Sequence, residues 1–226
     1  MCGRLTITTK DKAKLTAVFP NLVIPDWPGP RYNVAPSQDV AAILNERPNV
    51  LAWVRWGLIP RWAKDAAIGN KLINARAETL AEKPSFSDAF AKRRCLILAD
   101  GFYEWAAVPG QKTKQPYFIR LRSGEPFAFA GLWERWRAPD ENELTTCTII
   151  TTTPNEMLAK IHDRMPVILT GDACDRWLAP GPPPADLLAT YSADAMEMQP
   201  VSTMVNNARH EDSRCVEAVP SDAELI

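Results

Sequence analysis

The chain has 226 residues, of which 46% are hydrophobic and 23% charged, and its formal net charge is −1 at pH 7. This composition is typical of a soluble globular protein with a substantial core. No run of residues is long and apolar enough to span a bilayer, and no signal peptide is visible. We therefore expect a cytoplasmic protein with no membrane partner, organised as a single domain over residues 1–226.

The cysteines and histidines argue against a disulfide framework and a metal site. No two cysteines have CxxC spacing, and an odd count of this kind indicates free thiols in a reducing compartment. The chain has two histidines, too few for a His-rich metal site. We expect no metal and no cofactor. The cysteines are Cys2, Cys95, Cys147, Cys174 and Cys215.

Charge is distributed unevenly along the chain. Residues 1–137 contain 21 Lys and Arg against 12 Asp and Glu, whereas residues 138–226 contain 5 against 15. Such asymmetry can mark a nucleic-acid face. It can equally mean that the two halves attract each other within one fold, and composition alone leaves both interpretations open.

The chain opens Met1-Cys2-Gly3-Arg4. Initiator methionine is normally removed before a small residue, which would leave Cys2 with a free α-amine beside its thiol. An α-amine has a pKa of roughly 7.7–8.0 against about 10.4 for Lys, so a useful fraction of it is neutral at pH 7. The thiol is intrinsically very nucleophilic. A terminal 1,2-aminothiol of this kind can attack a carbonyl twice and close a five-membered ring.

The predicted elements alternate short helices with β-rich runs. Residues 10–18 are expected to form a helix capped by Thr8 or Thr9, and the Pro-rich residues 25–36 a turn-rich loop. A second helix is expected to begin at Thr153, with Pro154 at its first position, and to run to Ile161. A third covers residues 171–178. Strands are expected at 40–44, 51–58, 95–99, 117–121, 127–133 and 144–152.

The spacing of the strands predicts the fold class. Many strands lie too close together in sequence for helical crossovers, so antiparallel pairing is favoured. We therefore expect an α+β protein whose mainly antiparallel sheets form a barrel-like or sandwich core, with short helices at the periphery.

Several motifs in chain order carry a family resemblance. They are Cys2-Gly3-Arg4, the stretch RYNVAP at 31–36, WGLIPRW at 56–62, NARAET at 74–79, GFYEW at 101–105 and IHDRMP at 161–166. Together they resemble the SOS response-associated peptidase (SRAP) family, also called abasic site processing proteins. The resemblance runs through nearly the whole chain and is closest to the compact bacterial type, although residues 180–195 do not align clearly.

The resemblance implies a covalent reaction with damaged DNA. Family members recognise abasic sites in single-stranded DNA, including single-strand/double-strand junctions. The α-amine of Cys2 would attack the C1′ aldehyde of the ring-opened sugar to form a Schiff base, and the thiol would then close a thiazolidine. The cross-link would shield the lesion during the DNA damage (SOS) response. AP-lyase activity and cysteine-type autopeptidase processing of the N-terminus are further implied activities, and we expect a monomer that associates with the nucleoid when it binds DNA.

Three residues besides Cys2 are predicted to be catalytic. By resemblance, the amide of Asn74 orients the α-amine. Glu104 follows an apolar strand and sits between aromatic residues, where burial would raise its pKa and let it exchange protons with the sugar. His162 titrates near neutrality and could move protons on the ring oxygen. From the sequence alone, the alternatives are a turn Asn, a solvated Glu at a strand end and a His at a helix end.

Single-strand binding has a plausible basis in the aromatic and basic residues of 53–62. Binders of single strands combine stacking aromatics with a cationic groove. Among these tryptophans we expect only Trp62 to be exposed to DNA. The resemblance assigns phosphate contacts to Arg4, Arg76 and Arg164, and places Pro36 and Thr151 at the lesion pocket.

Three other functions remain possible from the sequence. An N-terminal-nucleophile glutamine amidotransferase would also begin Met-Cys-Gly, but the His-Arg-Gly-Pro-like and Asn-Gly-Glu motifs typical of that class are missing. A peptidase could pair Cys2 with His162 as thiol and imidazole. A non-catalytic single-strand binding module would use the tryptophans and arginines without needing Cys2.

Overall fold

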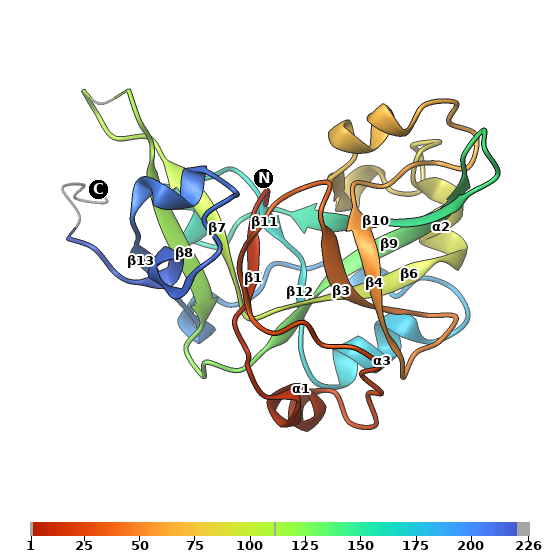
Figure 1. Cartoon of the computed structure of the whole chain (residues 1–226), viewed down its shortest axis with the longest axis horizontal. Coiled ribbons are helices and arrows are strands. Elements are labelled where there is room, and N and C mark those ends of the chain that lie inside the picture. The colour runs from red at the N-terminus through yellow and green to blue at the C-terminus, as the bar shows by residue number, and fades with distance from the viewer. Residues whose placement is uncertain (1, 111, 221–226) are drawn as a thin grey trace.

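The structure, a computed structural model, describes residues 2–110 and 112–220. Two β layers lie side by side, and the chain starts between them, in the upper half of the view (Figure 1). The first layer, on the left of Figure 1, is a sheet in the order β13-β8-β7-β1-β2. Its strands are β1 (Leu5–Ile7), β2 (Arg31–Val34), β7 (Gly101–Ala106), β8 (Gln115–Leu121) and β13 (Met196–Pro200).

The second layer is a barrel. Within the described residues, strands β10, β4, β3, β6 and β9 pair in that order, and β9 pairs again with β10, which closes the ring. The pairing of β10 with β4 is parallel and the other pairs are antiparallel. Closure leaves none of these strands as an open edge. The strands are β3 (Asp39–Leu44), β4 (Leu51–Trp56), β6 (Arg94–Ala99), β9 (Phe127–Arg137) and β10 (Glu143–Thr152).

The barrel interior and the facing side of the first sheet share one hydrophobic core. Ile97 and Phe129 of the barrel belong to the same buried cluster as Phe102 and Ile119 of the sheet. The rings of Phe102 and Phe129 meet edge to face, with centroids 5.7 Å apart. The interior is tight at Gly131, because a β-carbon there would lie 2.9 Å from the sulfur of Cys95 and 3.0 Å from the Thr148 carbonyl oxygen.

Short helices cover the outer face of the barrel, where a second buried cluster lies. Leu15 of α1 and Trp177 of α3 both belong to it and are fully buried. The helices are α1 (Lys12–Val18), α2 (Ser87–Lys92) and α3 (Asp172–Leu178). The 3-10 helices are η1 (Ala66–Lys71), η2 (Ala77–Thr79), η3 (Leu158–Lys160), η4 (Ala185–Leu187), η5 (Ala193–Ala195), η6 (Thr203–Asn206) and η7 (Ser213–Val216).

Three short strands extend the barrel: β5 (Asn74–Arg76), β11 (Met165–Pro166) and β12 (Ile168–Leu169). The second half of β10 lies between β5 and β11, because Thr151 pairs with Arg76 on one side and with Pro166 on the other. This arrangement brings the segments at 74–79 and 161–166 to the same end of β10.

The predicted α+β class with mainly antiparallel, barrel-like sheets is confirmed. All six predicted strands form, with ends that differ by a few residues. The loop predicted at 25–36 contains β2, which the Pro-rich composition concealed. The first helix begins at Lys12, and its cap is Asp11, whose side chain accepts the N–H of Ala13, rather than Thr8 or Thr9. The helix at 171–178 is α3.

The helix predicted from Thr153 to Ile161 is wrong. Only the single 3-10 turn η3 forms there. Asn155 is buried, accepts the N–H of Leu158 at 2.9 Å and donates to the Tyr191 carbonyl at 3.0 Å. The bond to Tyr191, which lies 36 residues later, holds the chain in a turn, and a local helix-start pattern does not override it.

Candidate functional site

Cys2 lies at the top of the core shared by the two layers. It is fully buried and belongs to the interior cluster. Its thiol lies 3.9 Å from the Arg4 carbonyl oxygen. Burial, and then the nearby Glu104 carboxyl, raise the pKa of the thiol well above its ordinary range. Met1, whose removal the sequence predicts, lies outside the described residues.

Two sets of hydrogen bonds anchor β1 and the segment before it, which contains Cys2. Asp100 accepts hydrogen bonds from the Thr6 hydroxyl at 2.7 Å and from the Thr8 backbone at 2.5 Å. The Arg4 guanidinium donates to the Asn33 side chain and to the Val205 carbonyl, each at 2.6 Å. Cys2 therefore directly precedes a segment that hydrogen bonds hold both before β1, at Arg4, and after it, at Thr8.

Asn33, which accepts a hydrogen bond from Arg4, also bonds to the C-terminal part of the chain. Its side chain is fully buried and donates to the carbonyls of Val205, Asn207 and His210 at 2.8–3.2 Å while its oxygen accepts from Arg4. This one amide joins the N-terminal strand, β2 and the C-terminal segment around η6.

Replacing Asn33 with Ala should destabilise the fold. The change leaves a buried Arg4 donor and several carbonyls without the hydrogen bonds that Asn33 makes to them. Each buried unsatisfied group costs roughly 1–3 kcal/mol. We expect a loss of about 3 kcal/mol in the free energy of unfolding, measured in urea. Asn142→Ala is the matched control, because Asn142 is exposed and bonds only within its own turn. Equal midpoints for the two variants would contradict this role of Asn33.

Asn74 contacts Cys2 directly. Its Nδ2 donates to the Cys2 carbonyl at 2.8 Å. Its Oδ1 is buried and has no hydrogen-bond partner among the described residues.

Glu104 points into the same core. On β7 the side chains alternate, so Phe102, Glu104 and Ala106 face the cluster that contains Cys2, while Tyr103 and Trp105 face the opposite side of the sheet. Glu104 therefore lies inside a strand, and the alternative of a solvated Glu at a strand end is wrong. It is 2% exposed, and burial raises its pKa from 4.5 to about 7. This carboxyl can both give and take a proton near neutral pH.

His162 follows η3 and is a quarter exposed. Its Nδ1 accepts the backbone N–H of Arg164 at 3.0 Å. Partial burial lowers its pKa, which favours the neutral ring. In a neutral ring whose Nδ1 accepts, the proton is on Nε2. Lys114 and Asp163 influence the pKa values of both His162 and Glu104, so these two groups share one electrostatic environment.

Three of the predicted DNA-contact residues meet at the end of β10. Thr151, fully buried, pairs in register with Arg76. Its carbonyl accepts from Arg164 at 2.6 Å. The Nε atoms of Arg164 and of Arg4 are buried and lack a hydrogen-bond partner among the described residues. Arg76 and Arg164 therefore both lie beside Thr151 at this end of β10.

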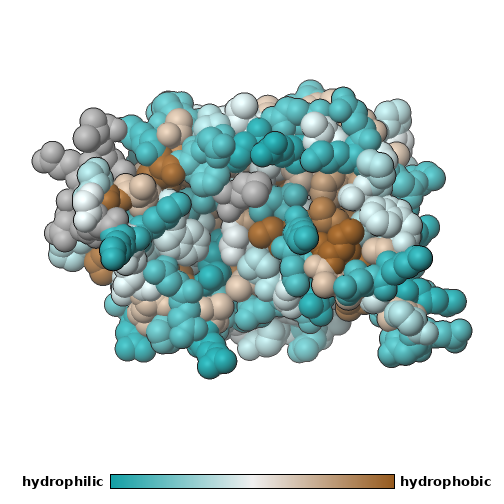
Figure 2. Space-filling model, turned by 90° about the horizontal axis from the view of Figure 1, so that it is seen from above, coloured by the Kyte–Doolittle hydropathy of each residue, from teal (hydrophilic) through white to brown (hydrophobic). Residues whose placement is uncertain are grey.

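Trp62 is 59% exposed, as the sequence predicted. Its loop is held by Arg61, which pairs with Glu134 at 2.9 Å, and by the Trp136 indole, which donates to the Ala63 carbonyl at 2.8 Å. Within the described chain, neither Trp62 nor Pro36 is hydrogen-bonded to the residues at the end of β10. Seen from above, the N-terminal face is largely hydrophilic, with small hydrophobic patches (Figure 2).

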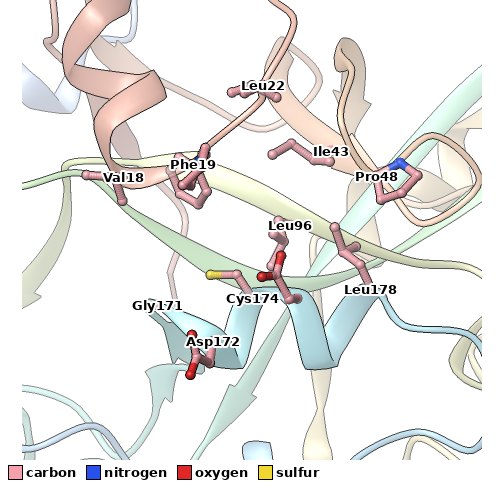
Figure 3. Close-up of a pocket in the computed structure, with 12 residues that line it drawn as sticks. Val18, Phe19, Leu22, Ile43, Pro48, Leu96, Gly171, Asp172, Cys174 and Leu178 are labelled. Carbon is pink, nitrogen blue, oxygen red and sulfur yellow. The ribbon is translucent and has the colours of Figure 1, made fainter.

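An apolar pocket lies at the opposite end of the molecule, between α1 and α3 (Figure 3). Phe19 and Leu22 line one side, and Cys174 and Leu178 line the other. It contains none of the predicted site residues. In the described part of the chain, no group of three or more His, Cys, Asp or Glu side chains is arranged to hold a metal ion. No described helix is long and apolar enough to cross a membrane.

Sequence reasoning gave no role to two residues that organise the site. Asn33 stands inside the RYNVAP stretch, but neither charge nor periodicity distinguishes it. Glu78 stands inside the NARAET stretch and forms a two-point ion pair with Arg164, at 2.7 and 2.9 Å. In both cases the partners are far away in sequence, so membership of a motif was the only available signal.

Comparisons with known proteins find similar chains and one matching family. The model of the family described as SOS response associated peptidase (SRAP) matches residues 1–208. The chain is 48% identical to an abasic site processing protein of Bacillus subtilis, YoqW, across 96% of this chain and 100% of the relative. It is 31% identical to the abasic site processing protein HMCES of Xenopus tropicalis, across 97% of this chain and 78% of that one. A crystal structure of a protein from Bacteroides thetaiotaomicron superposes with a TM-score of 0.84 at 25% identity, covering 97% of this chain and all of that one.

Proposed function

The chain belongs to the SOS response associated peptidase family, and from that premise we propose that it processes abasic sites in DNA by bonding to them covalently through Cys2. The names of its relatives support a role at abasic sites. The observation that carries the covalent step is the hydrogen bond from Asn74 to Cys2, which holds the second residue of the chain beside a buried, protonatable carboxyl.

The proposed reaction needs no group outside the protein and the DNA. After removal of Met1, the α-amine of Cys2 adds to the C1′ aldehyde of the open sugar, and loss of one water gives an imine. The thiol then adds across the imine carbon, and its proton moves to the nitrogen to give a thiazolidine. Ring closure is intramolecular, so it is favoured even though burial keeps the thiol protonated.

Asn74 is proposed to orient the amine, and Glu104 to transfer protons to and from the reacting sugar. The buried Oδ1 of Asn74 accepts from the α-amine and directs its lone pair toward the aldehyde. Glu104, with its pKa near 7, protonates the departing oxygen and later accepts a proton. His162, protonated on Nε2, donates to the sugar oxygen during ring opening.

Arg4, Arg76 and Arg164 are proposed to contact phosphates, with Pro36 and Thr151 at the lesion. Such contacts give affinity without sequence preference, so selectivity comes from the aldehyde itself. We further propose that the partner is single-stranded DNA or a single-strand/double-strand junction, and that the cross-link shields the lesion from cleavage. Competing lyase activity, removal of the N-terminal residue by the protein itself, a monomeric state and a cytoplasmic location belong to the same proposal.

Removing the exposed indole should weaken binding without affecting the fold. Because stacking contributes roughly 1–3 kcal/mol per base, Trp62→Ala should raise the dissociation constant for single-stranded DNA by about 5- to 150-fold. The measurement is fluorescence anisotropy at fixed salt. Val23→Ala is the control, since Val23 is similarly exposed at 52%. Unchanged affinity in Trp62→Ala, or an equal loss in Val23→Ala, would remove Trp62 from the binding face.

The protonation state of the Cys2 thiol supports a peptidase or amidotransferase reaction less well than it supports cross-linking. Those reactions need a thiolate or a thiol activated by a base, whereas burial raises the pKa of the Cys2 thiol. Imine formation depends on the amine instead, and the amine needs little activation.

A denaturing gel tests the proposal. The protein is incubated with three single-stranded oligonucleotides that carry an abasic site, a borohydride-reduced abasic site or an intact base. We expect a heat-stable shifted band with the first alone, because the other two lack an aldehyde. A shift with the reduced site, or no shift with the abasic site from protein whose N-terminus is Cys2, would refute the covalent mechanism.

A further inference from the structure

Glu78 forms one of the best-aligned ion pairs near the site. Its two oxygens accept from the two terminal nitrogens of Arg164, at 2.7 and 2.9 Å. The hydrogen bonds from Arg164 lower the pKa of Glu78, so the carboxylate is ionised at neutral pH. Two-point Arg–carboxylate pairs fix the orientation of the guanidinium as well as its position.

The guanidinium end of Arg164 is held by a second contact as well. One terminal nitrogen also donates to the Thr151 carbonyl at 2.6 Å, and the side chain is 12% exposed. The backbone of Arg164 leads directly into β11, which pairs with β10. The backbone N–H of this fixed residue is the group that approaches His162.

Nδ1 of His162 has two neighbours that demand opposite protonation. The N–H of Arg164, at 3.0 Å, requires a lone pair on Nδ1. The Asp163 carboxylate, at 2.9 Å, requires a proton on Nδ1. Both bonds cannot form on a neutral ring. The N–H is part of a fixed backbone, whereas the Asp163 side chain is 87% exposed and can turn away.

We infer that Glu78 is a positioning residue for His162: by holding Arg164, it keeps the Arg164 N–H against Nδ1 and so fixes the proton of the neutral ring on Nε2. This inference rests on the proposed proton-transfer role of His162 and adds a residue that sets it. Without Glu78, Arg164 would gain freedom, and Asp163 could capture a proton on Nδ1. The wrong tautomer presents a lone pair where the reaction needs a donor.

Nuclear magnetic resonance of the ring nitrogens tests the inference on the DNA-free protein. Two-dimensional proton–nitrogen spectra at pH 8.5 distinguish the two neutral tautomers of each His. The second histidine is an internal standard, because Nδ1 of His210 lies 2.8 Å from the Met204 carbonyl, which can only accept. We expect Nε2–H for His162 and Nδ1–H for His210.

The variants then separate positioning from general loss of structure. Glu78→Ala should convert His162 to a mixture of tautomers, and adding Asp163→Ala should restore Nε2–H because the competing acceptor is gone. Glu78→Gln should act in the same direction, and it replaces Glu78→Ala if circular dichroism shows that the latter is unfolded. Glu197→Ala is the control, since it breaks the 2.6 Å pair with Arg120 on the other sheet.

Kinetics give the second readout. In Glu78→Ala the cross-linking rate at saturating DNA should fall about tenfold, part of the roughly 10²–10⁴-fold that acid–base catalysis supplies, and Asp163→Ala should recover it. Nδ1–H on His162 in the wild type, or Nε2–H retained in folded Glu78→Ala and Glu78→Gln, would overturn the inference. Because the spectra need no DNA, failure of the wild type to cross-link would count against the proposed function alone.

Discussion

Replacing Cys2 with Ala or Ser is expected to remove the heat-stable cross-link entirely. Both residues are small, so Met1 should still be removed and the α-amine should remain. The amine can form an imine with the abasic aldehyde, but Ala has no second nucleophile and the Ser hydroxyl is far weaker than a thiol. The imine therefore stays reversible, and heating in water returns free DNA.

Borohydride trapping distinguishes this loss from loss of binding. Added during the incubation, borohydride should reduce the imine and restore a covalent band with both variants. Mass spectrometry of each N-terminus confirms that Met1 is gone. A heat-stable band formed by Cys2→Ala without borohydride would contradict the thiazolidine, and the absence of a trapped band would contradict the role of the amine.

Glu104→Gln is expected to slow cross-linking by roughly 10²–10⁴-fold, the usual contribution of a positioned acid–base group. The pH profile carries the more specific prediction. The rate of the wild type should rise as the amine, with a pKa of roughly 7.7–8.0, loses its proton. It should fall as Glu104, with its pKa of about 7, loses the proton that it donates. The result is a bell-shaped profile with its maximum between these values.

Gln cannot ionise, so the variant should lose the alkaline decline and retain only the rise. Initial rates at single turnover between pH 5.5 and 9.5 measure both limbs. An alkaline decline that persists unchanged in Glu104→Gln would assign it to another group. Equal rates for the two proteins would exclude Glu104 from proton transfer.

Stability gives an independent check on the same side chain. Burial raises the pKa of Glu104 from 4.5 to about 7, so its favourable contribution is complete below pH 4.5 and lost as pH rises through 7. The shift corresponds to roughly 3 kcal/mol. We therefore compare the free energies of unfolding of Glu104→Gln and the wild type in urea at two pH values. The difference should shift in favour of the variant between pH 5 and pH 8. A slower yet more stable variant would show that the lost activity is not unfolding.

The strands were predictable because their sequences carry the signal locally. The runs at 127–133 and 144–152 are rich in β-branched and aromatic residues, and both form long barrel strands. The helix expected after Thr153 failed for the converse reason. Its start pattern is local, but the buried side chain of Asn155 bonds to the Tyr191 carbonyl, 36 residues later, and this contact decides the conformation.

The site was predictable as a list of residues but not as a geometry. The motifs named Cys2 and Asn74, and the hydrogen bond between them spans 72 residues of sequence. The pair of Arg164 with Glu78 spans 86 residues, and the link between Arg4 and Val205 spans 201. No pattern within one segment specifies such partners. They depend on the register of β10 between β5 and β11, which only the folded chain provides.

The most direct test of the central claim is the mass of the cross-linked N-terminal peptide. The protein is reacted with an abasic oligonucleotide without reductant, digested with protease and nuclease, and sequenced by tandem mass spectrometry. The account predicts a peptide that begins at Cys2, lacks Met1 and carries the abasic sugar with the loss of one water, with fragments that place the sugar on Cys2. A sugar attached to a lysine, or to a peptide that still begins with Met1, would contradict it.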